Sequence, residues 1–158
     1  MIKLVVFDFD GVFTDGKILF DNHGSAIKHY NVKDGTGINI LKKNGFEIGV
    51  ISGWPDNASQ KYILQHLKIN RISLGSDNKL NILKQWCCEL NIELYNVAYM
   101  GDDINDIEIL KNIELAGCPN DAIDSVKKVS DFISKKNGGC GAVREFCDYL
   151  LLHENITQ

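Results

Sequence analysis

The sequence has 158 residues, of which 44% are hydrophobic and 24% are charged. These proportions are typical of one globular domain with a substantial core, so we expect a single domain over residues 1–158. There are 17 basic and 21 acidic residues, and the resulting net charge of −4 argues against a general nucleic-acid-binding protein.

Sequence features that direct proteins to membranes or export are not evident. No apolar run approaches the roughly 18 to 20 residues of a transmembrane helix, and residues 1–7 are too short for a signal peptide. The five cysteines are an odd number without a CxxC pair, and the histidines lack zinc-ligand spacing. We therefore expect a cytoplasmic protein with reduced thiols, no zinc and no membrane partner.

Strand and helix signals alternate from the N-terminus onward. The continuous apolar run IKLVVFDF at residues 2–9 predicts a strand buried on both faces. Residues 17–32 predict a β-hairpin around the turn NHGS, and residues 36–45 predict a helix that ends at a glycine. FEIGVIS at residues 46–52 predicts a second buried strand.

The same alternation continues to the C-terminus. Further strands are expected at residues 71–75, 96–101 and 113–117, and helices at residues 56–69, 77–92, 105–112 and 121–129. A glycine-rich segment and a last helix follow at residues 138–153. Strands that are separated by helices indicate βαβ units, hence an α/β fold with a parallel sheet.

Polar residues follow four of the predicted strands. They are Asp8, Asp10, Thr14 and Asp15 after the first, Ser52 and Gly53 after the second, Ser76, Asp77 and Lys79 after the third, and Gly101, Asp102, Asp103 and Asp106 after the fourth. In parallel sheets the ligand site lies at the carboxyl ends of the strands. We therefore expect these residues to converge on one crevice.

The acidic residues of this set indicate a metal site. Asp8 and Asp10 are one residue apart, so in an extended segment their side chains point the same way. Two like charges at such a distance are unfavourable without a cation, although an Asp–Gly pair is also a common turn. With Asp102 and Asp103 they form an all-oxygen cluster that suits Mg²⁺.

The remaining polar residues are weak signals one by one. Ser52 can be an ordinary loop start, Lys79 a solvated lysine, and Asp106, four residues after Asp102, a surface charge. If a metal ion is also bound, a hydroxyl from Ser52 and an ammonium from Lys79 would form a site for a phosphoryl group. Transfer of a phosphoryl group depends mainly on electrostatic stabilisation of its oxygens.

Four stretches resemble the motifs of the haloacid dehalogenase superfamily of phosphotransferases. They are DFDGVFTD at residues 8–15, ISG at 51–53, NKL at 78–80 and GDDINDIEIL at 101–110. The first is similar to DxDGxxTD and the last to GDDxxD, and both are specific. The resemblance implies a three-layer Rossmann-like fold, with a small hairpin where other members carry a cap domain.

A narrower resemblance extends along nearly the whole chain. VKDGTGINILKKNGFEIGVISG and GGCGAVREFCDYLLL are similar to the capless branch that hydrolyses phosphorylated keto-sugar acids. Its members act on 3-deoxy-D-manno-octulosonate (KDO) 8-phosphate or on nine-carbon, sialic-acid-type 9-phosphates. The implied partner is thus a small anionic sugar phosphate, and the implied cofactor is Mg²⁺.

The resemblance also implies residue roles. Asp8 would be the nucleophile and Asp10 the general acid and then the base. Mg²⁺ would be held by Asp8, the Asp10 backbone carbonyl and Asp102, with Asp103 nearby directly or through water. Ser52 and Lys79 would hold phosphoryl oxygens. The substrate-binding set would comprise Thr14, Gly53, Asp106 (which would also orient Lys79), Gly138, Gly139 and Arg144.

Other features of the branch concern its assembly. The hairpin would associate with its copies into a homotetramer, and the glycine-rich segment would reach an adjacent active site.

Arg144 would meet a sugar carboxylate or phosphate, or would be a solvated arginine at a helix start. Gly35 and Gly37 would approach the ligand or form a turn before a helix. Trp54, where relatives often carry a charged residue, would line a pocket or pack.

Two other functional classes compete with an enzyme. One is a noncatalytic oligomerisation domain such as the C-terminal domain of CMP-sialic acid synthetases, which this chain also resembles. The other is a signalling receiver domain, which places its acidic pair on a different strand. The presence of Asp8, Asp10, Lys79 and Asp102 together favours the enzyme.

Overall fold

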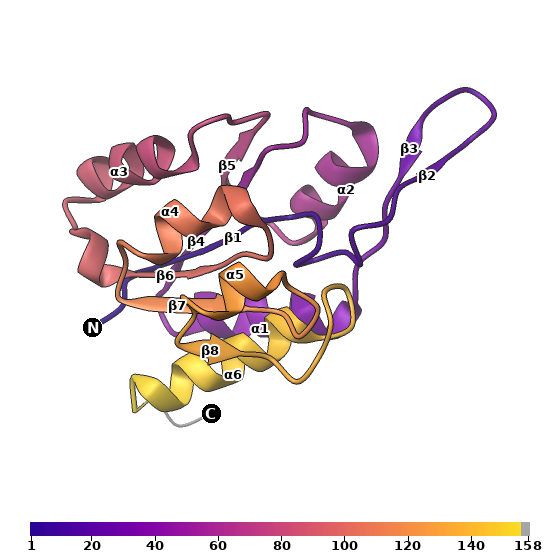
Figure 1. The fold of residues 1–158 in the computed structure, drawn as a ribbon. Coiled ribbons are helices and arrows are strands. Elements are labelled where there is room, and N and C mark those ends of the chain that lie inside the picture. Colours follow the sequence, from indigo (N-terminus) through magenta and orange to yellow (C-terminus); the bar gives the residue numbers. More distant parts are fainter. Residues whose placement is uncertain (156–158) are drawn as a thin grey trace.

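The computed structural model describes residues 1–155 and has an α/β fold built on a six-stranded sheet (Figure 1). The strand order is β5-β4-β1-β6-β7-β8, and every pair is parallel. The strands are β1 Leu4–Phe7, β4 Glu47–Ser52, β5 Arg71–Leu74, β6 Val97–Met100, β7 Leu115–Cys118 and β8 Phe132–Ile133. The predicted parallel α/β sheet is confirmed.

Helices cover both faces of this sheet, with α1 and α6 on one side and α3 and α4 on the other (Figure 1). The helices are α1 Val32–Lys43, α2 Ala58–His66, α3 Lys79–Leu90, α4 Ile107–Leu110, α5 Asp124–Lys127 and α6 Ala142–His153. Short 3₁₀ turns precede β6 and α4, at Leu94–Asn96 and Ile104–Asp106.

Alternate side chains of β1 supply two hydrophobic cores. Val5 and Phe7 pack with α1, α2 and α6, whereas Leu4 and Val6 pack with α3, α4 and α5. All four are fully buried, which is why the sequence of this strand is continuously apolar. The polar residues that follow β1 therefore begin where the cores end.

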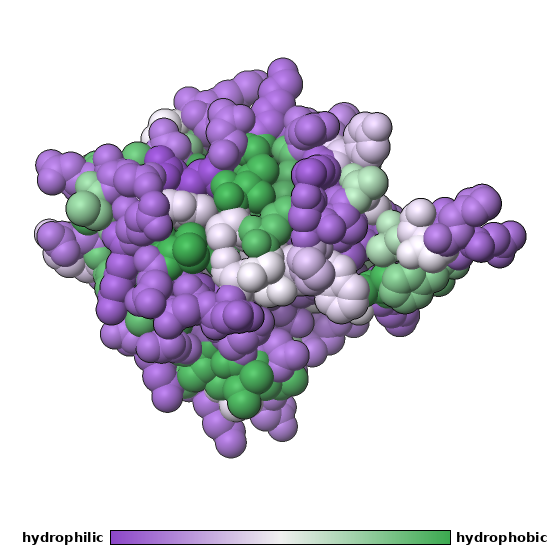
Figure 2. All heavy atoms as spheres, turned by 90° about the horizontal axis from the view of Figure 1, so that it is seen from above, coloured by the Kyte–Doolittle hydropathy of each residue, from purple (hydrophilic) through white to green (hydrophobic). Residues whose placement is uncertain are grey.

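A two-stranded hairpin, β2 Leu19–Phe20 and β3 Ala26–Ile27, projects from the body of the molecule (Figure 1). Its apolar side chains are largely exposed: 61% for Leu19, 63% for Phe20 and 48% for Ile27. Figure 2 shows hydrophobic surface on this projection. Exposed apolar residues clustered on one element are typical of interaction surfaces.

The structure corrects the predicted boundaries around α1. The hairpin strands are two residues long, and α1 begins at Val32 after the N-cap Asn31, inside the range assigned to the hairpin. Gly35 and Gly37 lie within α1, so the alternative that they form a turn before a helix is wrong. A Cβ on Gly37 would lie 3.1 Å from Cys147 Sγ, so this glycine allows α1 and α6 to pack closely.

Strand β8 was not predicted, and several helices are shorter than predicted. β8 has only two residues, too few for a recognisable pattern. The helices predicted at residues 105–112 and 121–129 are four-residue helices in the structure. Among residues 1–155 no helix has the length and apolar character needed to cross a membrane.

Close packing of β4 against α3 gives a test of the fold. A Cβ on Gly49 would lie 2.6 Å from the Trp86 ring, which is buried. Gly49→Ala should therefore lower the free energy of unfolding by about 1–3 kcal/mol in urea titrations. Glu47→Ala, at an exposed position of the same strand, is the control and should change it by less than about 0.5 kcal/mol.

Candidate active site

A cavity of about 500 Å³ lies at the carboxyl ends of the central strands and brings together residues that follow β1, β4, β5 and β6. It is lined by Asp8, Asp10, Gly11, Gly16, Ser52, Gly53, Trp54, Ser76, Asp77, Asp102, Asp103 and Asn105. Because β1 lies between β4 and β6, the chain reverses its direction of winding here. Such switch points are where open parallel sheets bind ligands.

Asp8 and Lys79 form a buried ion pair at the base of the cavity. Lys79 Nζ is 2.9 Å from Asp8 Oδ2, and the other carboxyl oxygen of Asp8 accepts a hydrogen bond of 2.6 Å from Phe9 N. Lys79 is the first residue of α3, where the N-cap Asn78 accepts a hydrogen bond from Asn81 N. The start of α3 thus fixes the lysine beneath the end of β1.

Asp106 is fully buried and connects Lys79 to the loop after β6. Its Oδ1 accepts hydrogen bonds of 2.7 Å from both Lys79 Nζ and the Tyr99 hydroxyl. Its Oδ2 accepts from the backbone N–H groups of Asp102 and Asp103, at 3.0 and 3.2 Å. Asp106 does not line the cavity. Its contacts are those of a residue that positions Lys79 and the acidic loop.

The cluster of Asp8, Asp102 and Asp106 has more carboxyl groups than the single ammonium group of Lys79 can neutralise. Burial and the neighbouring charge of Asp106 raise the pKa of Asp8 to about 7, although Lys79 opposes the shift. Burial, followed by the charges of Asp8, Asp106 and Asp103, raises the pKa of Asp102 to about 8. Burial acts to lower the pKa of Lys79, but Asp8 and Asp106 outweigh it and raise that pKa.

This acidic cluster fits a divalent cation. Carboxyl oxygens of Asp8, Asp102 and Asp106 lie within 4.8 Å of one another. The oxygens of Asp106 already accept four hydrogen bonds, so Asp8 and Asp102 are the better ligands. Gly11 leaves the space that Asp102 occupies, because a Cβ there would lie 1.9 Å from Asp102 Oδ2. Asp103 is exposed at the rim of the cavity.

Asp10 is paired with a lysine that sequence reasoning missed. Lys28 Nζ, at the base of the hairpin, lies 2.7 Å from Asp10 Oδ2. Asp10 Oδ1 is buried without a hydrogen-bond partner among the described residues. Nothing in the hairpin sequence AIKHY marks Lys28 as different from a solvated lysine. Tyr99 was also missed, but a tyrosine in a fully buried strand does require a partner for its hydroxyl.

Ser52 and Gly53 line the opposite wall at the end of β4. The Ser52 hydroxyl accepts a hydrogen bond of 3.2 Å from Trp54 N. Trp54 itself lines the cavity and is 42% exposed, which favours the first of its two predicted alternatives, a pocket wall.

Thr14, Gly138 and Gly139 are not among the residues that line the cavity. The Thr14 hydroxyl accepts hydrogen bonds from Gly11 N and Gly16 N, which stabilises the turn after β1. Gly138 packs so closely on this turn that a Cβ would lie 1.8 Å from Gly11 O, and Gly139 N donates to the carbonyl of Val12. Within one chain these three residues support the loop that carries the acidic motif.

Arg144 lies on α6, outside the cavity of its own chain. Its Nε donates to both carboxyl oxygens of Asp148, at 2.9 and 3.0 Å. Its backbone N–H donates to Asp34 Oδ1 on α1. Asp34 is fully buried, and burial raises its pKa to about 6.

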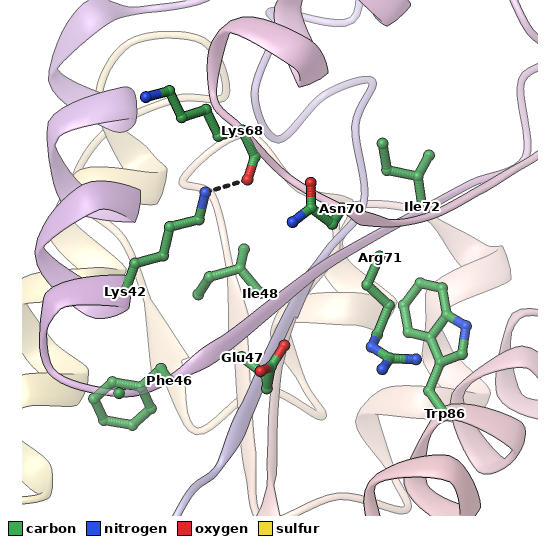
Figure 3. A pocket seen from close by; sticks show the side chains of 10 residues that line it. Lys42, Phe46, Glu47, Ile48, Lys68, Asn70, Arg71, Ile72 and Trp86 are labelled. Carbon is green, nitrogen blue, oxygen red and sulfur yellow. Dashed lines mark hydrogen bonds between the residues drawn. The ribbon is translucent and has the colours of Figure 1, made fainter.

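A second cavity, of about 590 Å³, lies at the opposite edge of the sheet, near the first residues of β4 and β5 (Figure 3). Two of its cations, Lys42 and Arg71, are already engaged. Lys42 Nζ donates to the carbonyls of Leu67 and Lys68, and Arg71 pairs with Glu89 while stacking on Trp86. The ammonium of Lys68 points away from the other labelled side chains. The first cavity is therefore the candidate active site.

The fold and this cluster define a known class of hydrolase. A family model described as haloacid dehalogenase-like hydrolase matches residues 55–146. The 3-deoxy-D-manno-octulosonate 8-phosphate phosphatase KdsC of Escherichia coli strain K12 is 35% identical over 151 residues, which cover 96% of this chain and 80% of that protein. The chain therefore belongs to the haloacid dehalogenase-like hydrolase family, as its motifs predicted.

Solved structures give the same result. A 3-deoxy-D-manno-octulosonate 8-phosphate phosphatase from Moraxella catarrhalis, in complex with magnesium, phosphate and KDO, has a TM-score of 0.93 and 35% identity. The match covers 98% of this chain and 88% of that one. The cobalt-bound enzyme from Haemophilus influenzae has a TM-score of 0.91 and 32% identity, covering 98% and 90%. The predicted resemblance to the capless branch is confirmed.

The raised pKa values of Asp8 and Asp102 predict a pH dependence of stability in the presence of EDTA. A carboxyl whose pKa is raised in the folded state contributes stability below its unfolded pKa of 3.8, and this contribution is lost as the pH rises through the folded pKa of about 7 or 8. The free energy of unfolding should therefore fall between pH 4 and pH 8, by about 1–3 kcal/mol.

The matched variant for this experiment is Asp102→Asn, which removes one of the two groups. Its unfolding free energy should depend less steeply on pH than that of the wild type over the same range. An equal slope in both proteins, measured by urea unfolding, would mean that Asp102 is not a protonated carboxyl in the folded state.

Proposed function

We propose that this protein is a Mg²⁺-dependent phosphatase that acts through an aspartyl-phosphate on Asp8. The observation that carries the proposal is the position of Asp8. It lies at the base of a cavity, 2.9 Å from the Lys79 ammonium and beside the carboxyl of Asp102. An anionic nucleophile can approach an anionic phosphate only where cations offset their repulsion.

Asp8, the Asp10 backbone carbonyl and Asp102 would hold the ion, with Asp103 at the rim. Bound Mg²⁺ supplies positive charge to the nucleophile and the phosphoryl oxygens together. The metal-bound relatives from Moraxella catarrhalis and Haemophilus influenzae support this assignment. The excess of carboxyls over ammonium groups in this chain supports it independently.

The chain's own residues divide the remaining work. A carboxyl oxygen of Asp8 attacks phosphorus while Asp10 gives its proton to the departing alcohol oxygen. Asp10 then takes a proton from the water that hydrolyses the aspartyl-phosphate. Ser52, through its hydroxyl, and Lys79 would hold the phosphoryl oxygens, while Asp106 keeps Lys79 in place.

The proposed substrate is a phosphorylated keto-sugar acid, with KDO 8-phosphate favoured over a nine-carbon 9-phosphate. The 8-phosphate is supported by the names of the relatives from Escherichia coli and Moraxella catarrhalis. Gly53 and Trp54 line the cavity beside Ser52, where the sugar would extend from its phosphate.

We further propose a homotetramer in which the hairpins associate and the active site is completed by a neighbour. The exposed apolar residues Leu19, Phe20 and Ile27 support this assembly. In it the segment that contains Gly138, Gly139 and Arg144 would lie near an adjacent active site. The cysteines are free thiols, which is consistent with a cytoplasmic location.

A noncatalytic oligomerisation domain remains the alternative. Such a domain has no requirement for a buried lysine between two carboxyls or for a tyrosine hydroxyl directed at Asp106. Buried ionic networks of this kind reduce stability unless they are fully satisfied, so their presence favours the enzyme.

Activity measurements test the proposal. Phosphate release from KDO 8-phosphate should require Mg²⁺, and Asp8→Asn should reduce kcat by at least about 10³-fold because the nucleophile is lost. A nine-carbon 9-phosphate is the comparison substrate. Glu114→Gln, at an exposed position just before β7, is the control and should retain wild-type activity. If the wild-type protein hydrolyses neither substrate in the presence of Mg²⁺, the proposed phosphatase function is wrong.

Assembly is tested separately by light scattering. Phe20→Asp introduces a charge into the apolar surface of the hairpin and should convert a tetramer into smaller species. Tyr62→Asp, at an exposed aromatic residue of α2, is the matched control and should leave the mass unchanged. A monomeric wild-type protein at micromolar concentration would contradict the tetramer.

A further inference from the structure

The hairpin places one buried side chain against a residue of the active site. Lys28 directly follows β3, and its ammonium lies 2.7 Å from Asp10 Oδ2. The lysine side chain is 0% exposed, whereas that of Asp10 is 24% exposed. A buried lysine is rare without a carboxylate partner, and Asp10 is that partner here.

The backbone of Lys28 is fixed by α2. The Ser59 hydroxyl accepts a hydrogen bond of 2.8 Å from Lys28 N and donates one of 3.1 Å to Lys28 O. One side chain thus satisfies both backbone groups of the lysine. This double contact fixes the base of the hairpin to α2, although the rest of the hairpin projects from the body of the molecule (Figure 1).

Two aromatic rings hold the other end of the lysine. Its Nζ lies 5.5 Å from the centroid of the Phe9 ring and 5.2 Å from that of Trp54. Phe9 stands between Asp8 and Asp10 in the sequence, and Trp54 lines the cavity. Cation–π contacts of this kind attract the ammonium toward the two rings, and they strengthen when the cation is buried.

Asp10 depends on this lysine for its orientation. Among the described residues, Lys28 is the side-chain donor that contacts the Asp10 carboxyl, and Asp10 Oδ1 has no partner. Without the ammonium, the Asp10 carboxyl would have no hydrogen bond or ion pair from a side chain in the described part of the chain. Lys28 is too buried to reach a ligand, so its effect must pass through Asp10.

We propose that Lys28 is a positioning residue for the proton transfer performed by Asp10, and that Ser59 and the hairpin base set its position. This inference rests on the proposed phosphatase function. As the bond between Asp8 and phosphorus forms, the bond from phosphorus to the leaving oxygen breaks. That oxygen receives the Asp10 proton, while Lys28 keeps its own proton throughout.

Leaving-group dependence separates this role from a structural one. An alkyl phosphate needs a proton on its poorly leaving alkoxide, whereas p-nitrophenyl phosphate releases a stable phenolate with little help. Lys28→Gln, which keeps a donor but loses the charge, should lower kcat on KDO 8-phosphate or another alkyl phosphate by about 10²-fold. On p-nitrophenyl phosphate the loss should be less than about fivefold, with KM little changed on both.

Two further variants link this effect to Asp10. Asp10→Asn should show the same selective loss, and the double variant should be no slower than Asp10→Asn alone, since both act on one step. Ser59→Ala keeps the lysine and should give a weaker loss with the same selectivity. Lys84→Gln is the control, because this lysine is exposed on α3, outside the hairpin, and it should behave as wild type.

The opposite results are equally specific. Equal losses on both substrates, or multiplicative losses in the double variant, would make Lys28 a structural residue and overturn the proposal. A rise in KM for the sugar phosphate alone would make it a substrate contact and overturn it as well. Failure of the phosphatase function is distinguishable, because wild-type protein would then not hydrolyse p-nitrophenyl phosphate with Mg²⁺.

Discussion

One buried ammonium group, that of Lys79, faces the carboxyls of Asp8 and Asp106 at the carboxyl edge of the sheet, and the site depends on this contact. The Asp106 carboxyl also accepts hydrogen bonds from the Tyr99 hydroxyl and from the backbone of the loop that carries Asp102. The lysine therefore ties the ends of β1 and β6 to the start of α3. The cluster remains short of positive charge, and this shortage favours the proposed binding of a divalent cation.

The fold supplies this arrangement from elements that differ in rigidity. β1 is buried in two cores, so Asp8 has almost no freedom at its end. The hairpin is held to the body near its base, where Ser59 contacts the backbone of Lys28. One lysine from the body thus contacts the proposed nucleophile, and a second lysine from the hairpin contacts the proposed acid. The two carboxyls of the first motif receive separate cations and so can have separate tasks.

Periodicity and strand-end polarity predicted the sheet and the residues gathered at its edge, because both follow from local sequence. Lys28 could not be predicted, since its burial depends on a contact with α2 that is 31 residues away. The helical state of Gly35 and Gly37 was missed because glycine disfavours helices, and packing against Leu67 and α6 outweighs that preference. Strand β8 has only two residues, so its sequence shows no alternation of apolar and polar residues from which a strand could be predicted. Local sequence patterns thus predicted the acidic residues of the site, but they did not predict Lys28, the cation that orients Asp10.

The carboxyls around Lys79 are proposed to lack enough positive charge and therefore to bind Mg²⁺. Calorimetric titration with Mg²⁺ at pH 7, in buffers of different ionisation enthalpy, tests this proposal most directly. Because the pKa values of Asp8 and Asp102 are raised to about 7 and about 8, binding must displace protons from them. The expected result is release of about one proton per Mg²⁺ bound. Mg²⁺ binding without proton release, or the absence of binding at millimolar Mg²⁺, would contradict the account.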